Sequence, residues 1–365
     1  MRDLEHEPVD VGRRATGRTR GHRQGTSKYC FRPQIRERGS WTAPISRRPS
    51  AADRRVGRKA CAARPCAGTV VGRVGARNRR EWEPSAFAGQ NGPMSDGSDL
   101  AWLGLERRGE GRWSFELTSP LTRHDGKLYG GAGIAASVAT IEAETGRDAL
   151  WTTTQFVGSA DMGDRIDCHV EVLARGRRTS QVRVTGTAGD HIVFAALGAT
   201  GAARKGPVEI QVGTMPDAPA PEHGESWSSR HRHRQDPDNP TSWFQIAEMR
   251  HVEDGRYIWA RMRDGGHTRA TIAFLADMVP SAVVRAAGKM GGGTSLDNAI
   301  RYGAMADTDW ILLDMDPYFG SGGYLHGAAR VWAEDGTLLA VASQTATAMV
   351  WEGDIPPWLS EESRG

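Results

Sequence analysis

The sequence predicts an α+β protein built from two copies of one unit, each a helix followed by an antiparallel sheet. Each copy begins with a stretch of helical periodicity and continues with stretches in which apolar and polar residues alternate. The same order occurs twice along the chain, which indicates an internal duplication. A helix packed on an antiparallel sheet is an α+β architecture.

Residues 1–93 differ from the rest of the chain in charge. They carry 21 Lys+Arg against 8 Asp+Glu, whereas residues 94–365 carry 26 against 36. A segment this rich in Arg, Gly and Pro buries too little apolar surface to fold, so we predict a disordered basic extension. Such a segment can bind nucleic acid. No nucleic-acid-binding motif accompanies the charge, so we favour an extension with no selected role, for which an over-long gene model with its real start at Met94 is one explanation.

Composition argues against several other classes of protein. Three of the four cysteines lie in the basic extension, so the remainder needs no disulfide. The start of the chain lacks an apolar signal region, and no run approaches the roughly 18 apolar residues of a membrane span. Cys61 and Cys66 lack a second ligand pair for a metal site. We therefore expect a cytoplasmic protein with no membrane segment, no metal and no cofactor.

The first unit is predicted over residues 100–203. Its helix spans Gly130 to Thr145, with Ile134 and Val138 on one face and Gly146 as the left-handed cap. Strict alternation follows over residues 165–172, and a hairpin follows with strands at 181–187 and 191–200.

The second unit is predicted over residues 243–352, after an exposed linker at 204–242. Its helix carries Ile272, Leu275 and Val283 on one face and should kink at Pro280. The predicted strands are 295–302, 310–315, 323–332 and 337–350. Sliding the first unit by 146 residues places Leu150 on Leu296 and Ala196 on Ala342 without a gap, which supports the duplication.

Several motifs resemble the acyl-CoA thioesterase II family, whose plan is the double hotdog, two helices each wrapped by an antiparallel sheet. In the first unit the resemblance rests on KLYGG at 127–131 and QFVG at 155–158. In the second unit it rests on TSLDN at 294–298, DWILL at 309–313 and DGTLLA at 335–340 leading into ASQ at 342–344. These motifs extend over about residues 100–352, and the resemblance implies a hydrolase of acyl-CoA thioesters in fatty acid metabolism.

The resemblance also implies site residues. In the family an Asp in the Leu-Asp strand and a Gln in the last hairpin, helped by a Thr or Ser, position the attacking water, which points to Asp297 and Gln344. Ser321 is the aliphatic hydroxyl near the third position, where this chain has no Thr. Asn298 stands where the family often has His.

These residue types suit thioester hydrolysis. Asp297 can accept the proton of a water, and the Gln344 amide can hold that water in line without adding charge. The pair Gly130 and Gly131 opens a helix N-terminus, where exposed N–H groups and the helix dipole favour an oxyanion. A plain helix-entry turn explains the glycines equally well. At the 146-residue offset Gln344 falls on Gly198, as expected if the two units share one site.

Other interpretations stay open. A noncatalytic acyl-CoA-binding protein would keep the fold without the activity, and a hotdog hydratase would need a His acting with the Asp. Asp277, on the second helix, is a weaker candidate acid because a helical Asp is more often partly exposed. By analogy with hotdog proteins, whose sheets pair at their edges, we expect a homodimer.

Overall fold

The structure is a computed structural model, and it describes residues 98–204, 206, 208–226 and 242–351. The predicted disordered extension at 1–93 and residues 227–241 of the predicted linker lie outside the described residues.

The first half contains the predicted helix and strands at nearly the predicted bounds. Helix α2 ends at Thr145, and the capping residue Gly146 has the expected left-handed φ of 63°. The elements of this half are α1 (Ser98–Leu103), β1 (Glu106–Gly109), β2 (Arg112–Glu116), the 3₁₀ helix η1 (Ser119–Leu121), α2 (Gly130–Thr145), β3 (Asp148–Phe156), β4 (Arg165–Arg175), β5 (Thr179–Ala188) and β6 (His191–Gly201).

The second half repeats the order, but its helix is split in two. Pro280 lies in the first turn of the second piece, where its missing N–H costs no intrahelical bond. The elements are η2 (Pro221–His223), β7 (Glu225–Ser226), η3 (Ser242–Gln245), β8 (Ala247–Val252), η4 (Glu253–Gly255), β9 (Tyr257–Met262), α4 (Arg269–Leu275), α5 (Val279–Ala286), β10 (Met290–Tyr302), β11 (Ile311–Ser321), β12 (Tyr324–Ala333) and β13 (Leu338–Trp351).

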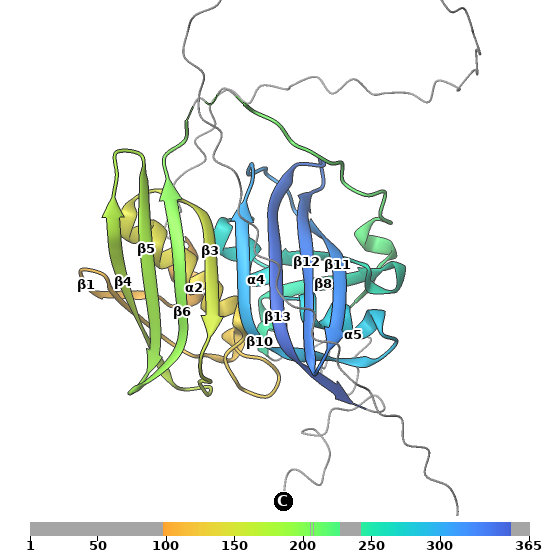
Figure 1. Cartoon of the computed structure of the whole chain (residues 1–365), viewed down its shortest axis with the longest axis horizontal. Helices are drawn as coiled ribbons and strands as arrows, with labels where there is room; N and C mark the ends of the chain where they lie inside the picture. Colours follow the sequence, from red (N-terminus) through yellow and green to blue (C-terminus); the bar gives the residue numbers. More distant parts are fainter. Residues whose placement is uncertain (1–97, 205, 207, 227–241, 352–365) are drawn as a thin grey trace, which may run out of the picture. The chain divides into compact units, whose positions relative to one another are not determined.

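The strands of the described residues form one 13-stranded antiparallel sheet, in the order β1-β2-β4-β5-β6-β3-β10-β13-β12-β11-β9-β8-β7. Strands β3 and β10 join the two halves side by side (Figure 1), and Thr153 pairs with Ala299. These two residues are 146 positions apart, so the seam relates the halves by an approximate twofold axis. The double-hotdog fold predicted from the duplication is confirmed.

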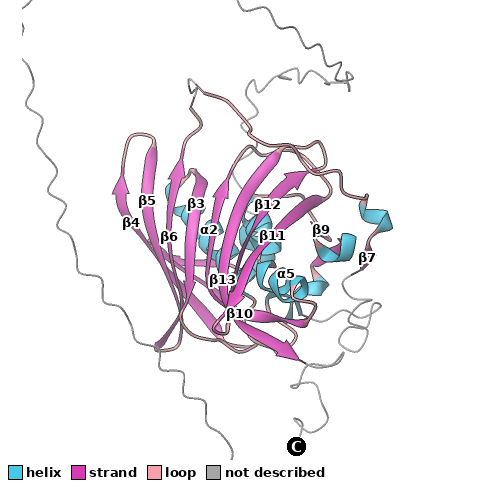
Figure 2. Ribbon diagram, turned by 45° about the vertical axis from the view of Figure 1, so that its right-hand side comes forward, coloured by secondary structure: helices cyan, strands magenta, loops and turns pink. Residues whose placement is uncertain are grey.

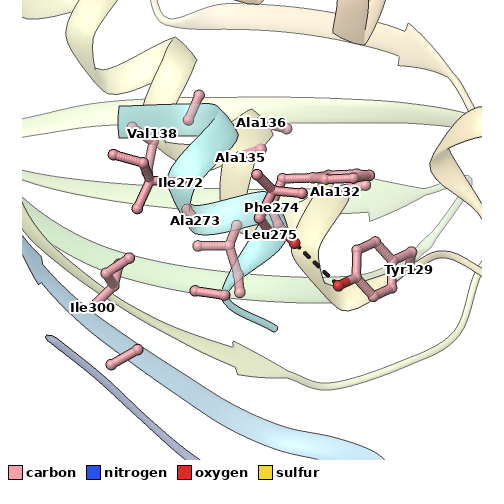
Figure 3. Packing of buried hydrophobic residues seen from close by; sticks show 14 of the residues in the cluster. Tyr129, Ala132, Ala135, Ala136, Val138, Ile272, Ala273, Phe274, Leu275 and Ile300 are labelled. Carbon is pink, nitrogen blue, oxygen red and sulfur yellow. Dashed lines mark hydrogen bonds between the residues drawn. The ribbon is translucent and has the colours of Figure 1, made fainter. Parts of the chain in front are cut away.

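The two central helices supply the core. Figure 2 shows α2 and α5 behind the row of strands, and Figure 3 shows residues of α2 and α4 packed against each other. Helix α2 is buried on nearly all sides, which its small residues permit, with Ala132, Ala135 and Ala136 fully enclosed. None of the helices in the described segments is both long and apolar enough to cross a membrane.

The linker is not an exposed connector along its whole described length. Met215 and Ala218 pack against a cluster of aromatic and aliphatic residues on the second half that includes Trp332. The Gln211 side chain bonds the turn between β12 and β13, donating to Gly336 O and accepting from Leu338 N. The polar composition of the linker concealed these few anchoring residues.

Candidate active site

A pocket opens where the seam between the two halves ends. The pairing of β3 with β10 stops at Gln155 and Asp297. Beyond that point Phe156 and residues 291–295 line a pocket, together with Gly130 at the start of α2. Asp277, between α4 and α5, lines the same pocket. The split in the second helix thus places a carboxylate opposite the N-terminus of the first.

Asp277 is buried, with 8% of its surface exposed, and its carboxylate is held by donors from both halves. Gly131 donates its backbone N–H to the carboxylate. Asn298 donates from Nδ2 at 3.3 Å, and Gln344 donates from Nε2 at 2.5 Å. These three donors orient the carboxylate toward the pocket.

Burial changes the acidity of this group. Desolvation raises the pKa of Asp277 from 3.8 to about 7, although the hydrogen bonds from Asn298, Gln344 and Gly131 act in the opposite direction. Loss of solvation is therefore the dominant effect. A carboxylate with a pKa near the working pH is suited to accept a proton during catalysis.

Gln344 connects the carboxylate to a hydroxyl. Its amide nitrogen donates to Asp277 Oδ1 and to Ser295 Oγ, the latter at 2.6 Å. This leaves the Ser295 hydroxyl proton available to another acceptor. The Gln344 Oε1 atom is buried and has no hydrogen-bond partner among the described residues. A buried acceptor without a partner is costly, so this oxygen is suited to bind a water or a ligand group.

The glycine pair is required by close packing. A Cβ on Gly130 would lie 2.4 Å from Asp277 Oδ2, and a Cβ on Gly131 would lie 2.4 Å from Phe274 O. Glycine therefore lets the N-terminus of α2 approach Asp277 and α4. The close approach expected of these glycines is present within the chain itself, and their predicted role in binding an oxyanion stays a prediction.

Tyr129, the residue before α2, fixes the same region. Its hydroxyl donates to Phe274 O at 3.0 Å (Figure 3), and Asp277 O lies 3.4 Å away. The ring stacks on Trp243, with centroids 5.5 Å apart. The hydrogen bond from Tyr129 to Phe274 O connects the start of α2 to the end of α4.

The structure brings together only part of the predicted site. Gln344, Gly130 and Gly131 meet around one carboxylate, but that carboxylate is Asp277 and not Asp297. Asp297 lies at a β-bulge and accepts the backbone N–H of Thr345 at 2.8 Å. Ser321 is exposed at the end of β11, and Ser295 supplies the hydroxyl beside Gln344. The β-bulge between Ser295 and Asp297 explains the difference, because it shifts the alternation of β10 by one residue and turns Asn298, not Asp297, toward the carboxylate.

The sequence made Asp277 only a weaker candidate acid, because a helical Asp is more often partly exposed. One signal pointed the other way, because Asp277 is flanked by an apolar run on one side and by Pro280 on the other. A helix interrupted by proline next to a lone acid indicates a buried helix end. Ser295 lies inside the TSLDN motif, but the family resemblance pointed to a hydroxyl near residue 321.

Models of known protein families match both halves of the chain. Residues 118–201 match the model of the acyl-CoA thioesterase N-terminal domain, and residues 211–348 match the model of the acyl-CoA thioesterase C-terminal domain. The matches follow the order of the two halves. No curated protein matches the chain.

Solved structures show the same fold. A structure described as a thioesterase from Novosphingobium aromaticivorans is 27% identical, with a TM-score of 0.60, and covers 67% of this chain and 98% of its own. A tesB protein from Mycobacterium avium subspecies paratuberculosis is 22% identical, with a TM-score of 0.57, covering 69% and 99%. An acyl-CoA thioesterase II from Mycobacterium marinum is 19% identical, with a TM-score of 0.55, covering 71% and 100%.

Proposed function

Because this chain belongs to the acyl-CoA thioesterase family and is thereby a thioester hydrolase, we propose that it cleaves acyl-CoA beside Asp277. The observation that carries the proposal is a hydrogen-bonded cluster: Asp277 and Ser295 line the pocket, and Gln344 donates to both of them. Asp277 takes the place that the sequence assigned to Asp297.

Asp277 acts as the general base. A water beside its carboxylate transfers a proton to it as the water oxygen attacks the thioester carbonyl carbon. Gln344 orients this water through Oε1, the acceptor without a partner among the described residues. Because its amide group also donates to Asp277, Gln344 fixes water and base relative to each other.

The developing oxyanion needs a donor aimed into the pocket. The N–H groups at the start of a helix have no intrahelical acceptor, and Gly131 gives its own to Asp277. Gly130 is the first residue of α2 and lines the pocket, so we assign its N–H to the oxyanion. The Ser295 hydroxyl is a second donor at the same wall.

Collapse of the tetrahedral intermediate breaks the carbon–sulfur bond. The proton held by Asp277 passes to the departing thiolate, which leaves as the free thiol of CoA, and the acyl group leaves as the acid. This returns Asp277 to its ionised form. The predicted cytoplasmic location and homodimer stay predictions.

The test compares two aspartates. Asp277→Asn removes the base, and we expect thiol release from acyl-CoA to fall about a hundredfold or more. Gln344→Ala should also lower the rate. Asp297→Asn is the matched control, because among the described residues its carboxylate bonds only the Thr345 backbone, and it should keep activity within a few-fold. A loss with Asp297→Asn and none with Asp277→Asn would return the role of base to Asp297.

A further inference from the structure

The pocket has two ends of different chemistry. At one end the lining comes from the segment 123–127 and includes Arg123, His124, Asp125 and Lys127. At the other end it comes from Pro280 and Ser281 of α5, residues 291–293 of β10, and Met349. These described lining residues at the second end carry no charge.

The catalytic group lies between the two ends. The charged segment leads directly along the chain into Gly130, and β10 leads from residue 293 to Ser295. Pro280 follows Asp277 by three residues. A thioester held at Asp277 therefore sends one of its two substituents toward each end.

The charged end suits the CoA half of the substrate. Arg123 pairs with Asp125 at 2.5 Å, and Lys127 pairs with Asp161 at 2.5 Å, so ion pairs hold both cations in this part of the lining. The phosphates of CoA are drawn to cations and are not stabilised at an uncharged wall. The apolar acyl chain then lies at the uncharged end, beside α5 and the start of β10.

The three consecutive glycines at that end are not equivalent. A Cβ on Gly291 would lie 2.1 Å from Met349 O, and one on Gly293 would lie 2.7 Å from Thr347 O. Packing against β13 therefore explains both. A Cβ on Gly292 would meet only Ser281 Oγ, at 3.5 Å, which is an ordinary contact.

Gly292 therefore has no steric requirement to be glycine. Its φ lies outside the left-handed region that favours this residue, and it lines the pocket opposite Ser281. What the missing side chain does provide is open space between β10 and α5.

We infer that the acyl chain lies in this space, the groove between residues 291–293 and Ser281, and that the bare Gly292 sets the length of chain the enzyme accepts. The inference rests on the proposed function, because it needs a thioester held at Asp277. Each methylene that the groove buries raises kcat/KM by about fourfold. A side chain at position 292 occupies that volume and removes the gain for long chains only.

The test measures kcat/KM of the full chain with acetyl-, hexanoyl-, decanoyl- and palmitoyl-CoA. We expect the ratio of decanoyl to acetyl activity to fall in order from wild type through Gly292→Ala and Gly292→Val to Gly292→Phe, by about thirtyfold at the end of the series, as for two or three excluded methylenes. Gly266→Phe is the matched control, because a Cβ at Gly266 meets nothing within 4 Å, and its ratio should stay at the wild-type value.

Ser281→Phe narrows the groove from the opposite wall and should lower the same ratio, which keeps the test decisive if the variants at 292 do not fold. An equal loss with every acyl-CoA would assign the groove to the CoA arm and overturn the inference. An unchanged ratio, or a wild-type enzyme that accepts acetyl-CoA alone, would overturn it as well. Absence of thiol release from all four substrates by the folded wild type would instead reject the proposed function.

Discussion

Gly130 and Asp277 approach so closely that a single methyl group on Gly130 would lie 2.4 Å from Asp277 Oδ2. Gly130→Ala should therefore displace the carboxylate or the start of α2. We expect kcat/KM to fall on the order of a hundredfold, since small displacements of catalytic groups have effects of this size. Activity and melting temperature should be measured together, with Gly266→Ala as control. Full activity in Gly130→Ala would show that this approach is not needed for catalysis.

The activity should depend on pH through Asp277. Burial raises its pKa to about 7, and a base must be ionised to act. We expect kcat/KM to rise with pH through about 7 and to level off above it. The measurement is a pH profile of kcat/KM with a saturated-chain acyl-CoA. An inflection near 4 would mean that the titrating base is a solvated carboxylate and not Asp277.

A second buried acid should affect stability. Desolvation raises the pKa of Glu142 from 4.5 to about 7, opposed mainly by the hydrogen bond from Ala149 N. The folded state therefore binds this proton more tightly than the unfolded state does. The contribution is fully present below about pH 4.5, and it is lost as pH rises to about 7, a change of at most about 3 kcal/mol.

Glu142→Gln tests this contribution, because Gln keeps an acceptor for Ala149 N without the ionisation. We expect the variant to be more stable than the wild type at pH 8, with little difference at pH 4.5. Urea unfolding at the two pH values measures the change. A wild-type advantage at pH 8 would contradict the expected sign.

The linker contact can be tested with one substitution. Gln211→Ala removes both side-chain bonds to the turn at 336–338, and a typical pair of exposed hydrogen bonds contributes about 1 kcal/mol. We expect a drop of that size in the free energy of unfolding. Glu209→Ala, an exposed neighbour on the same segment, is the control. Equal effects of the two substitutions would mean that Gln211 does not anchor the linker.

The fold was predictable because its signals are local and repeated. Helix α2 has its predicted bounds, and β4 alternates as predicted, because period and capping glycine both act within a few residues. The site was predictable only in part. Gln344 and the glycine pair were found, but Asp277 meets them across 67 and more residues of chain, and nothing in local sequence measures its burial.

The bulge on β10 shows most plainly why the sequence could not predict the whole site. Asp297 and Asn298 are neighbours in one motif, yet the bulge before them directs Asn298 to the carboxylate and Asp297 to the Thr345 backbone. A shift of one position reverses the inward and outward faces of a strand. The register of β10 decides which residue of the motif reaches the site. That register is fixed by pairing with β3 and β13 and cannot be read from the motif alone.

The seam between β3 and β10 also has a genetic consequence. In an assembly of identical subunits every substitution appears in each copy, whereas halves joined in one polypeptide can change independently. Position 198, the counterpart of Gln344, is glycine, and a Cβ there would lie 3.0 Å from Trp151 O and 3.2 Å from Ile141 Cδ1. That half has no room for an amide. By the proposed mechanism each chain then has one reaction centre, to which the first half contributes the N-terminus of α2 but no counterpart of Gln344.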